Sequence, residues 1–252
     1  MQTIITDPPW FNRLLPQGLL IGTSALISGP GGSGKPLIGD TIAASWLRRG
    51  GSVIFMSLQY PSADFVYASM KHVAGLDLHD YENHIAFIAL DATIDGMEAP
   101  EGRRFRANVV KPAVWNAALA RATEMVPGGG PGVLVFGSAI NLLLFSPTYG
   151  RAILDKIKAT MTTEKAGRTY LFSASTTAKR EEIAEMEAIA DNLMMTRSEK
   201  EPFRLYLRVV RAKGVPFVNE EIEVPIPPGV LLEVKEVADH SRKRVVPQVS
   251  RL

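Results

Sequence analysis

Cysteine is absent from the 252 residues of the chain. The sequence therefore excludes disulfide bonds and thiolate metal sites, and its composition suits a reducing compartment. Histidine is also scarce, and the four histidines do not have the spacing of a metal site: His72, His79, His84 and His240. We expect no structural metal ion in this protein.

An excess of charge of one sign is missing too. The 28 basic and 26 acidic residues leave a net charge of +2, which is too small to require nucleic acid or another polyanion as partner. The longest apolar runs, such as 139–145, are far shorter than the ~20 residues of a membrane-spanning helix. The N-terminal MQTIITDPPWFNRLL lacks the basic and apolar regions of a signal peptide. We therefore expect a soluble, cytoplasmic protein without a membrane partner.

The sequence does contain an alternation of strand and helix patterns. Hydrophobic residues make up 46% of the chain, enough for the core of one large α/β domain. Continuous apolar runs, typical of parallel strands that are covered on both faces, occupy 24–28, 53–57, 85–90, 133–136 and 169–175. Apolar residues at helical spacing predict helices at 36–49, 63–74, 112–125, 149–164 and 180–190. The expected fold class is α/β, with a mainly parallel sheet flanked by helices.

The last quarter of the chain has a different pattern. The stretches LMMTR, FRLYLRVVRAKG and EEIEVPIPPGVLLEV resemble short strands joined by turns, which predicts an antiparallel C-terminal extension of the sheet. The final segment is basic, with Arg-Lys-Arg at 242–244. We expect one domain over residues 1–234 and a basic, flexible tail over residues 235–252.

The most specific motif is the glycine-rich loop SGPGGSGKPLIG at 28–39. It satisfies the pattern GxxxxGK between a predicted strand and a predicted helix, which is typical of a loop that holds nucleotide phosphates. Backbone N–H groups of such a loop surround the phosphate oxygens, and the dipole of the following helix favours an anion. The residues expected to bind the phosphates of ATP or ADP are Gly29, Pro30, Gly31, Gly32, Ser33, Gly34, Lys35 and Pro36.

One position of this loop lacks a group that the chemistry requires. A serine or threonine hydroxyl should follow Lys35 to hold Mg²⁺, and this sequence has Pro36 there. Proline also has no backbone N–H for the phosphates, and it disfavours helical backbone angles at Lys35. Since proline is tolerated in the first turn of a helix, we expect the helix to form while the binding of nucleotide and of Mg²⁺ is weakened.

Several stretches, taken in order, resemble the KaiC-like branch of the RecA-superfamily P-loop ATPases. These are QGLLIGTSALISGPGGSGK, GGSVIFMSLQYPSADF, IAFIALDAT, VLVFGSAINLL, EAIADNLMMTR and LRVVRAKG. The resemblance covers the chain from about Gln17 to Val234. The resemblance implies a RecA-like P-loop domain that binds ATP and assembles as a homo-oligomer, for which a hexameric ring is one form.

The resemblance also implies a catalytic site from which this sequence departs. The family's paired glutamates fall at Gln59 and Tyr60, and an amide or a phenol is a poor general base. The strand-end aspartate that orders Mg²⁺ falls at Gly137, which has no side chain. Together with Pro36, every main catalytic position that the resemblance maps is altered. This combination indicates impaired or lost hydrolysis.

The resemblance assigns a further role to basic residues on a late strand. Arg211 and Lys213 lie two residues apart, so both are expected on the same face of a predicted strand. In the family, basic residues at this place reach the γ-phosphate that a neighbouring subunit binds. A solvated strand face is an equal alternative for the two side chains.

DNA is another partner that a RecA-like fold suggests, but the sequence disfavours it. The loop NLLLFSPTYG after Gly137 carries no basic residue, and its apolar residues favour packing in a core or against a partner. The loop TTAKREE after Ser175 mixes charges and lacks the aromatic residues that stack on bases. The segment Glu101–Lys111 is expected to be a basic, irregular loop whose three arginines are solvated.

Three functions stay open on the sequence alone. The favoured one is a nucleotide-binding or structural regulatory module, oligomeric and impaired in ATP hydrolysis, with a protein partner that the sequence does not identify. The second is an active Mg²⁺-dependent ATPase that uses other residues, such as Ser33, Asp40 or Asp64. The third is an accessory protein of DNA repair or recombination, for which salt-sensitive binding of single-stranded DNA would be the sign.

Overall fold

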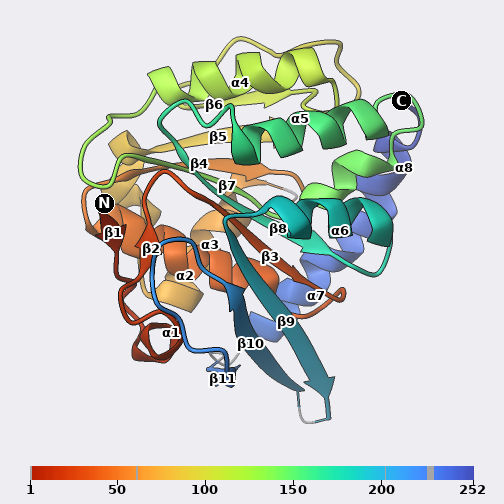
Figure 1. The fold of residues 1–252 in the computed structure, drawn as a ribbon. Helices are drawn as coiled ribbons and strands as arrows, with labels where there is room; N and C mark the ends of the chain where they lie inside the picture. The colour runs from red at the N-terminus through yellow and green to blue at the C-terminus, as the bar shows by residue number, and fades with distance from the viewer. Residues whose placement is uncertain (1, 61, 202, 226–229) are drawn as a thin grey trace.

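One large sheet forms the centre of the molecule (Figure 1). The computed structural model describes residues 2–60, 62–201, 203–225 and 230–252, with the backbone alone for residues 200 and 231–235. Within these ranges, nine strands lie side by side in the order β11-β10-β9-β3-β8-β7-β4-β5-β6. Their bounds are β3 Ser24–Gly29, β4 Ser52–Ser57, β5 Ile85–Leu90, β6 Arg104–Ala107, β7 Val133–Gly137, β8 Thr169–Ser175, β9 Asn192–Lys200, β10 Phe203–Arg211 and β11 Glu221–Val224. A short antiparallel pair, β1 Thr3–Ile4 with β2 Leu19–Leu20, precedes them.

The pairing of the strands is that of a mainly parallel α/β sheet. β3 pairs in parallel with β8 and β9, β7 pairs in parallel with β4 and β8, and β5 pairs in parallel with β4 and β6. At the far side, β9, β10 and β11 pair antiparallel. The α/β fold class and the antiparallel C-terminal extension expected from the sequence are thereby confirmed.

Helices cover both faces of the sheet, and each face has its own core. One core combines strand residues with α1 Pro9–Leu14, α2 Lys35–Arg48 and α3 Ala63–Ala74. The other combines strand residues with α4 Pro112–Glu124, α5 Gly150–Thr162 and α6 Arg180–Ile189. Short 3₁₀ helices occupy Leu78–His84 (η1) and Ile140–Phe145 (η2). In the described part of the chain, none of the helices has the length and apolar character that crossing a membrane requires.

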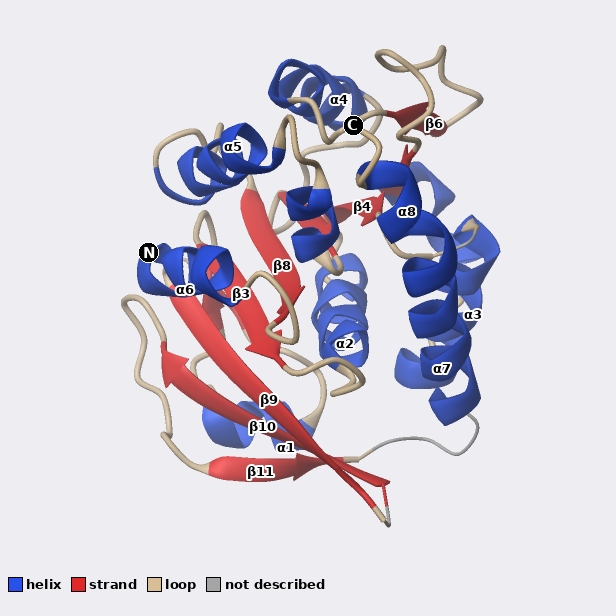
Figure 2. Cartoon of the chain, turned by 90° about the vertical axis from the view of Figure 1, so that its right-hand side faces the viewer, coloured by secondary structure: helices blue, strands red, loops and turns tan. Residues whose placement is uncertain are grey.

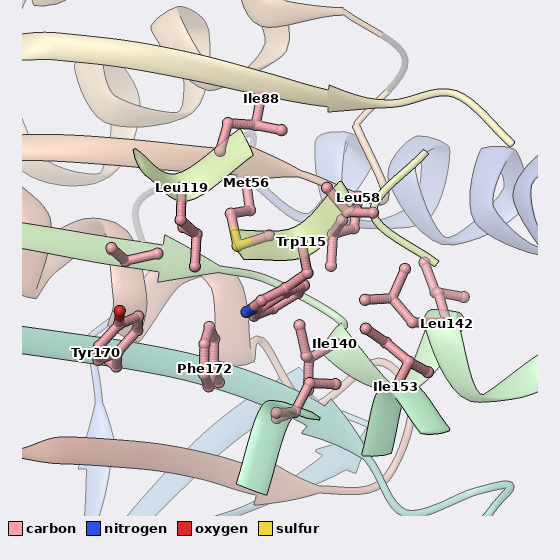
Figure 3. Close-up of a cluster of buried hydrophobic side chains, with 14 of the residues drawn as sticks. Met56, Leu58, Ile88, Trp115, Leu119, Ile140, Leu142, Ile153, Tyr170 and Phe172 are labelled. Atoms are coloured by element: carbon pink, nitrogen blue, oxygen red, sulfur yellow. The ribbon is translucent and has the colours of Figure 1, made fainter. Parts of the chain in front are cut away.

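Trp115 lies at the centre of the second core (Figure 3). Its ring centroid is 6.1 Å from that of Phe172 on β8, and both side chains are fully buried. The indole N–H donates to Oγ1 of Thr160 on α5 at 3.1 Å, so the polar atom of this large side chain is satisfied. Trp115 thereby fixes α4 against both α5 and β8, the strand whose end lies at the site described below.

The segment Glu101–Lys111 is not the irregular loop expected from its arginines. Residues Arg104–Ala107 form the edge strand β6, which pairs in parallel with β5. The exposed Arg104 and Arg106 alternate with the buried Phe105 and Ala107, which is the period of a strand with one buried face. Charged side chains are common on edge strands, and here they obscured the two-residue pattern.

The chain beyond β11 also differs from the strand and flexible tail expected there. Helix α7 Val230–His240, the π-helical turn η3 Ser241–Val245 and α8 Val246–Val249 form one helical segment, which we call the C-terminal arm. From Val237 on, its buried residues recur every four positions, the spacing of one helix face: Val237, Ser241, Val245 and Val249. The arm therefore packs on the domain by an apolar stripe. Residues 226–229 of the predicted last strand lie outside the described residues.

Candidate functional site

The glycine-rich loop lies at the carboxyl edge of the parallel strands. It joins β3 to α2, and the ends of β4, β7 and β8 face the same edge. Gly34 has a φ of 60° as the N-cap of α2, a left-handed conformation that glycine adopts at little cost. Pro36 lies in the first turn of α2, and the helix forms as expected despite it.

Lys35 is folded into its own loop. The residue is only 6% exposed, and its Nζ donates to the carbonyl oxygens of Gly29 at 3.0 Å and Pro30 at 2.6 Å and to Oγ of Ser33 at 3.1 Å. Burial lowers the pKa of the Lys35 ammonium from 10.5 to about 7. A bound phosphate would offer this ammonium an anionic partner in place of loop carbonyls and would stabilise its charge.

Two further contacts hold the loop. Oγ of Ser33 lies 2.7 Å from Oγ1 of Thr196 on β9 and is completely buried. The backbone N–H of Gly31 donates to Oγ1 of Thr177, in the turn after β8, at 2.9 Å. In a loop of this kind the N–H groups are the donors for phosphate, and here the N–H of Gly31 is engaged by Thr177.

At Gly137, to which the resemblance assigns a strand-end aspartate, the side chain of Phe172 occupies the neighbouring space. Gly137 ends β7 and lies opposite Phe172 of β8 in the sheet register. A Cβ atom at Gly137 would lie 2.9 Å from Cδ1 and 3.1 Å from Cε1 of the fully buried Phe172. A carboxylate therefore does not fit at this position unless the ring of Phe172 moves.

Gln59 and Tyr60, to which the resemblance assigns paired glutamates, follow β4. Nε2 of Gln59 donates to Oγ of Ser138 at 2.9 Å, and Gln59 is only 8% exposed. Tyr60 is half-buried and packs against the core of α2 and α3. An amide that donates to a hydroxyl has no basic atom to accept a proton from water.

The residues at this edge do not fit Mg²⁺, which requires oxygen ligands and usually one or two carboxylates. Pro36 has no hydroxyl and Gly137 has no side chain, as the sequence indicates. Among the described residues, no group of three or more histidine, aspartate and glutamate side chains is placed to hold a metal ion. A nucleotide at this loop would have to bind through the protein's own cations and N–H groups.

Arg211 and Lys213 do not share a strand face. β10 ends at Arg211, and Lys213 lies in the turn beyond it. Nε of Arg211 donates to the carbonyl of Ala190 at 2.8 Å, and Nζ of Lys213 lies 2.8 Å from Oδ1 of Asp191. Asp191 also accepts from the N–H of Ser24 at the amino end of β3, whereas the glycine-rich loop follows the carboxyl end. Within one protomer these cations are therefore remote from the loop, and a role toward a neighbouring subunit stays a prediction.

A cleft of about 450 Å³ opens over the glycine-rich loop, a volume typical of small-molecule sites. Two cations line it, Lys35 and Arg242, and none of its described lining residues is a carboxylate. Its walls include large apolar side chains, namely Phe65, Leu142, Phe145, Val237 and Val246. Positive charge beside apolar walls suits a ligand that carries both an anion and a flat, weakly polar group, as a nucleotide does.

The C-terminal arm forms one wall of this cleft, which the sequence did not predict. Ala238 and Ser241 line the cleft from the arm, and Oγ of Ser241 lies 3.5 Å from the carbonyl oxygen of Gln59. Figure 2 shows α7 running beside α3 and leading into α8. α8 packs on η2, so the apolar loop after Gly137 is buried in a core, one of the two arrangements expected for it.

The residues suggested for a non-standard ATPase are not placed for that chemistry. Asp40 is completely buried and accepts a hydrogen bond from Oγ of Ser69 at 2.5 Å. Ser69 lines the cleft, whereas Asp40 does not. Asp64 is exposed in the first turn of α3 and does not line the cleft. Ser33 lines it, but its hydroxyl contacts Thr196 and the carbonyl of Pro30.

The arginines of β6 and its neighbouring turn are engaged by the chain itself. Arg106 lies 2.9 Å from Asp91 and 2.5 Å from Glu98. The guanidinium of Arg104 stacks 5.2 Å from the ring centroids of both Tyr67 and Phe87. These contacts compete with phosphate groups for the same cations, which disfavours this surface as a site for nucleic acid.

Comparison with known proteins agrees with the fold. A family model described as the KaiC ATPase matches residues 3–237. The solved structure of a KaiC-like protein, PH0186 from the hyperthermophilic archaeon Pyrococcus horikoshii OT3, superposes with a TM-score of 0.67. The match covers 90% of this chain and 96% of that chain at 17% sequence identity, and it shows a shared fold. No curated protein matches the chain. Because the family model covers most of its residues, the chain belongs to the KaiC ATPase family.

Proposed function

We propose that this KaiC-family protein is a cytoplasmic nucleotide-binding module that has lost most or all ATP hydrolysis and acts as a regulatory component. The observation that carries the proposal is the lining of the cleft, which combines the phosphate-binding loop and Lys35 with no carboxylate among the described residues. Hydrolysis depends on groups that orient water and hold Mg²⁺, whereas phosphate binding depends on N–H groups and cations. The second set of groups is present here.

Nucleotide binding requires the loop to exchange internal contacts for contacts with phosphate. Lys35 leaves the carbonyls of Gly29 and Pro30, and the N–H of Gly31 leaves Thr177. These exchanges replace neutral acceptors by anionic ones, which make stronger hydrogen bonds. The base faces the apolar side of the cleft, near Phe65 and Phe145.

We expect ATP and ADP to bind without Mg²⁺ and without release of phosphate. Calorimetric titration with each nucleotide, in Mg²⁺ and in EDTA, measures the affinity. A phosphate-release assay on the same sample measures turnover. Because the described residues include no ligand set for the metal, the affinity should be the same in Mg²⁺ and in EDTA.

The matched control is Lys35→Met, purified in parallel, which removes the main phosphate cation. Phosphate release by the wild-type protein should equal that of this variant, since both then report contaminants. Mg²⁺-dependent release that disappears in Lys35→Met would establish the alternative, an active ATPase with non-standard residues. Failure of the wild-type protein to bind either nucleotide would leave a purely structural role.

We further propose that the protein assembles as a homo-oligomer, as the family resemblance implies. In such an assembly Arg211 and Lys213 would have to leave Ala190 and Asp191 to reach a neighbouring subunit. Light scattering across a range of protein concentrations, with and without ATP, should report species larger than the monomer. A monomer under all these conditions would remove the proposal and with it the trans-acting role of the two cations.

A further inference from the structure

The C-terminal arm is anchored on both sides of the cleft. At one end, α7 packs against α3. At the other end, Val245 and Val249 are buried in the core of α4, α5 and α6, where α8 meets η2. Between these anchors Val237, Ser241 and Arg242 line the cleft. The arm therefore borders the same cleft as the glycine-rich loop.

Arg242 is one of the two cations among the described residues of the cleft, and its partner at present is easily replaced. Its guanidinium lies 2.5 Å from Oδ1 of Asp239, one turn earlier on the arm, and its side chain is 77% exposed. An exposed ion pair of this kind contributes little to stability. A phosphate group in the cleft would offer the guanidinium a bidentate partner.

We propose that the C-terminal arm contributes to the nucleotide site of its own protomer and that Arg242 binds the phosphates together with Lys35. The inference rests on the proposed function, because it assumes that a nucleotide occupies the cleft. It assigns to this chain a phosphate-binding cation on an element that lies outside the glycine-rich loop and outside the strands.

The test compares two neighbouring arm residues. Arg242→Ala removes the cation that lines the cleft, while Lys243→Ala removes one that does not line it and that also faces Asp239, at 3.9 Å. Arg242→Ala should weaken ATP binding about tenfold, the effect of losing a hydrogen-bonded charge pair. Lys243→Ala should change it less than about twofold, as expected for an exposed cation. Arg242→Lys should restore part of the affinity, since the charge is kept and the bidentate geometry is lost.

The possible outcomes separate this inference from the proposed function. If wild type binds ATP and Arg242→Ala binds it with the same affinity, the role of Arg242 is overturned and the proposed function stays intact. Absence of ATP binding by wild type overturns both. Melting temperatures of the two alanine variants should equal that of wild type, because each loses only an exposed ion pair. Equal weakening by Arg242→Ala and Lys243→Ala would indicate a general effect of charge on the arm and would also overturn the role of Arg242.

A mixing experiment tests whether the arm acts within its own protomer. Lys35→Met and Arg242→Ala are mixed under conditions that permit subunit exchange, and ATP binding is titrated again. If Arg242 served the cleft of a neighbouring protomer, sites with both wild-type cations would form and tight binding would return to part of the sample. We expect no such recovery, and its appearance would overturn the assignment to one protomer.

Discussion

Gly137→Asp, which restores the strand-end carboxylate of the family, is expected to destabilise the protein by about 3 kcal/mol or more instead of rebuilding a metal site. The new Cβ would lie 2.9 Å from the ring of Phe172, which is completely buried and packs against Trp115 (Figure 3). The carboxylate would also be brought into a buried position without a cation beside it, since Lys35 is held by Gly29 and Pro30. Chemical denaturation, monitored by circular dichroism, measures the difference in the free energy of unfolding between the variant and wild type.

A double-mutant cycle isolates the steric part of this effect. Gly137→Ala introduces the Cβ without the charge and should cost about 1–2 kcal/mol through overpacking. Phe172→Leu shortens the side chain that fills the space, so the double variant Gly137→Ala with Phe172→Leu should be more stable than the sum of the single effects by about 1 kcal/mol. Additive effects would show that Phe172 does not exclude a side chain at Gly137.

The altered catalytic positions show which features of the site can be predicted from the sequence. Alignment of motifs identifies Gly137 as a position without a carboxylate, because the strand and its flanking residues are local in the chain. It does not show that Phe172 fills the vacated space, since the two residues meet only through the pairing of β7 with β8. The same holds for Gln59 and Ser138, which contact each other across neighbouring strands. The sequence gives the type of residue at each position, whereas the residues that contact it in space are determined by the tertiary structure.

The sequence predicts best the strands that have a continuous apolar run and the helices that have a regular apolar spacing. The helix Ala63–Ala74 and the strands Ile85–Leu90 and Thr169–Ser175 have the bounds expected from their apolar patterns. Periods interrupted by basic residues were missed, as in β6. In the C-terminal arm, the repeat of Val237, Ser241, Val245 and Val249 was present in the sequence, but arginines and a proline between these residues favoured the interpretation as a tail. Exposed charges do not oppose a helix or strand whose other face is buried.

Lys35→Met is expected to stabilise the nucleotide-free protein at neutral pH while abolishing nucleotide binding. Lys35 is 6% exposed and its acceptors are two carbonyls and one hydroxyl, so its charge is poorly compensated. A folded-state pKa of about 7 against 10.5 in the unfolded chain means that protonation opposes folding at pH 7. Methionine keeps the length without the charge, and after allowance for the lost hydrogen bonds the gain should be about 2 kcal/mol at pH 7.

The dependence on pH distinguishes this cause from better packing. Between pH 7 and pH 10 the unfolded wild-type chain binds a proton at Lys35 that the folded protein does not bind, so wild-type stability rises with pH over this window. The stability of the variant relative to wild type should therefore fall by about 3 kcal/mol from pH 7 to pH 10, so that the advantage at pH 7 becomes a disadvantage of about 1 kcal/mol at pH 10. Denaturation curves of both proteins at several pH values measure the difference in their free energies of unfolding. All other titrating groups are shared by the two proteins, so their contributions cancel in this difference. An advantage that stays constant with pH would mean that Lys35 is not held as a buried, poorly compensated cation. In that case the loop would not be poised to exchange its carbonyls for phosphate.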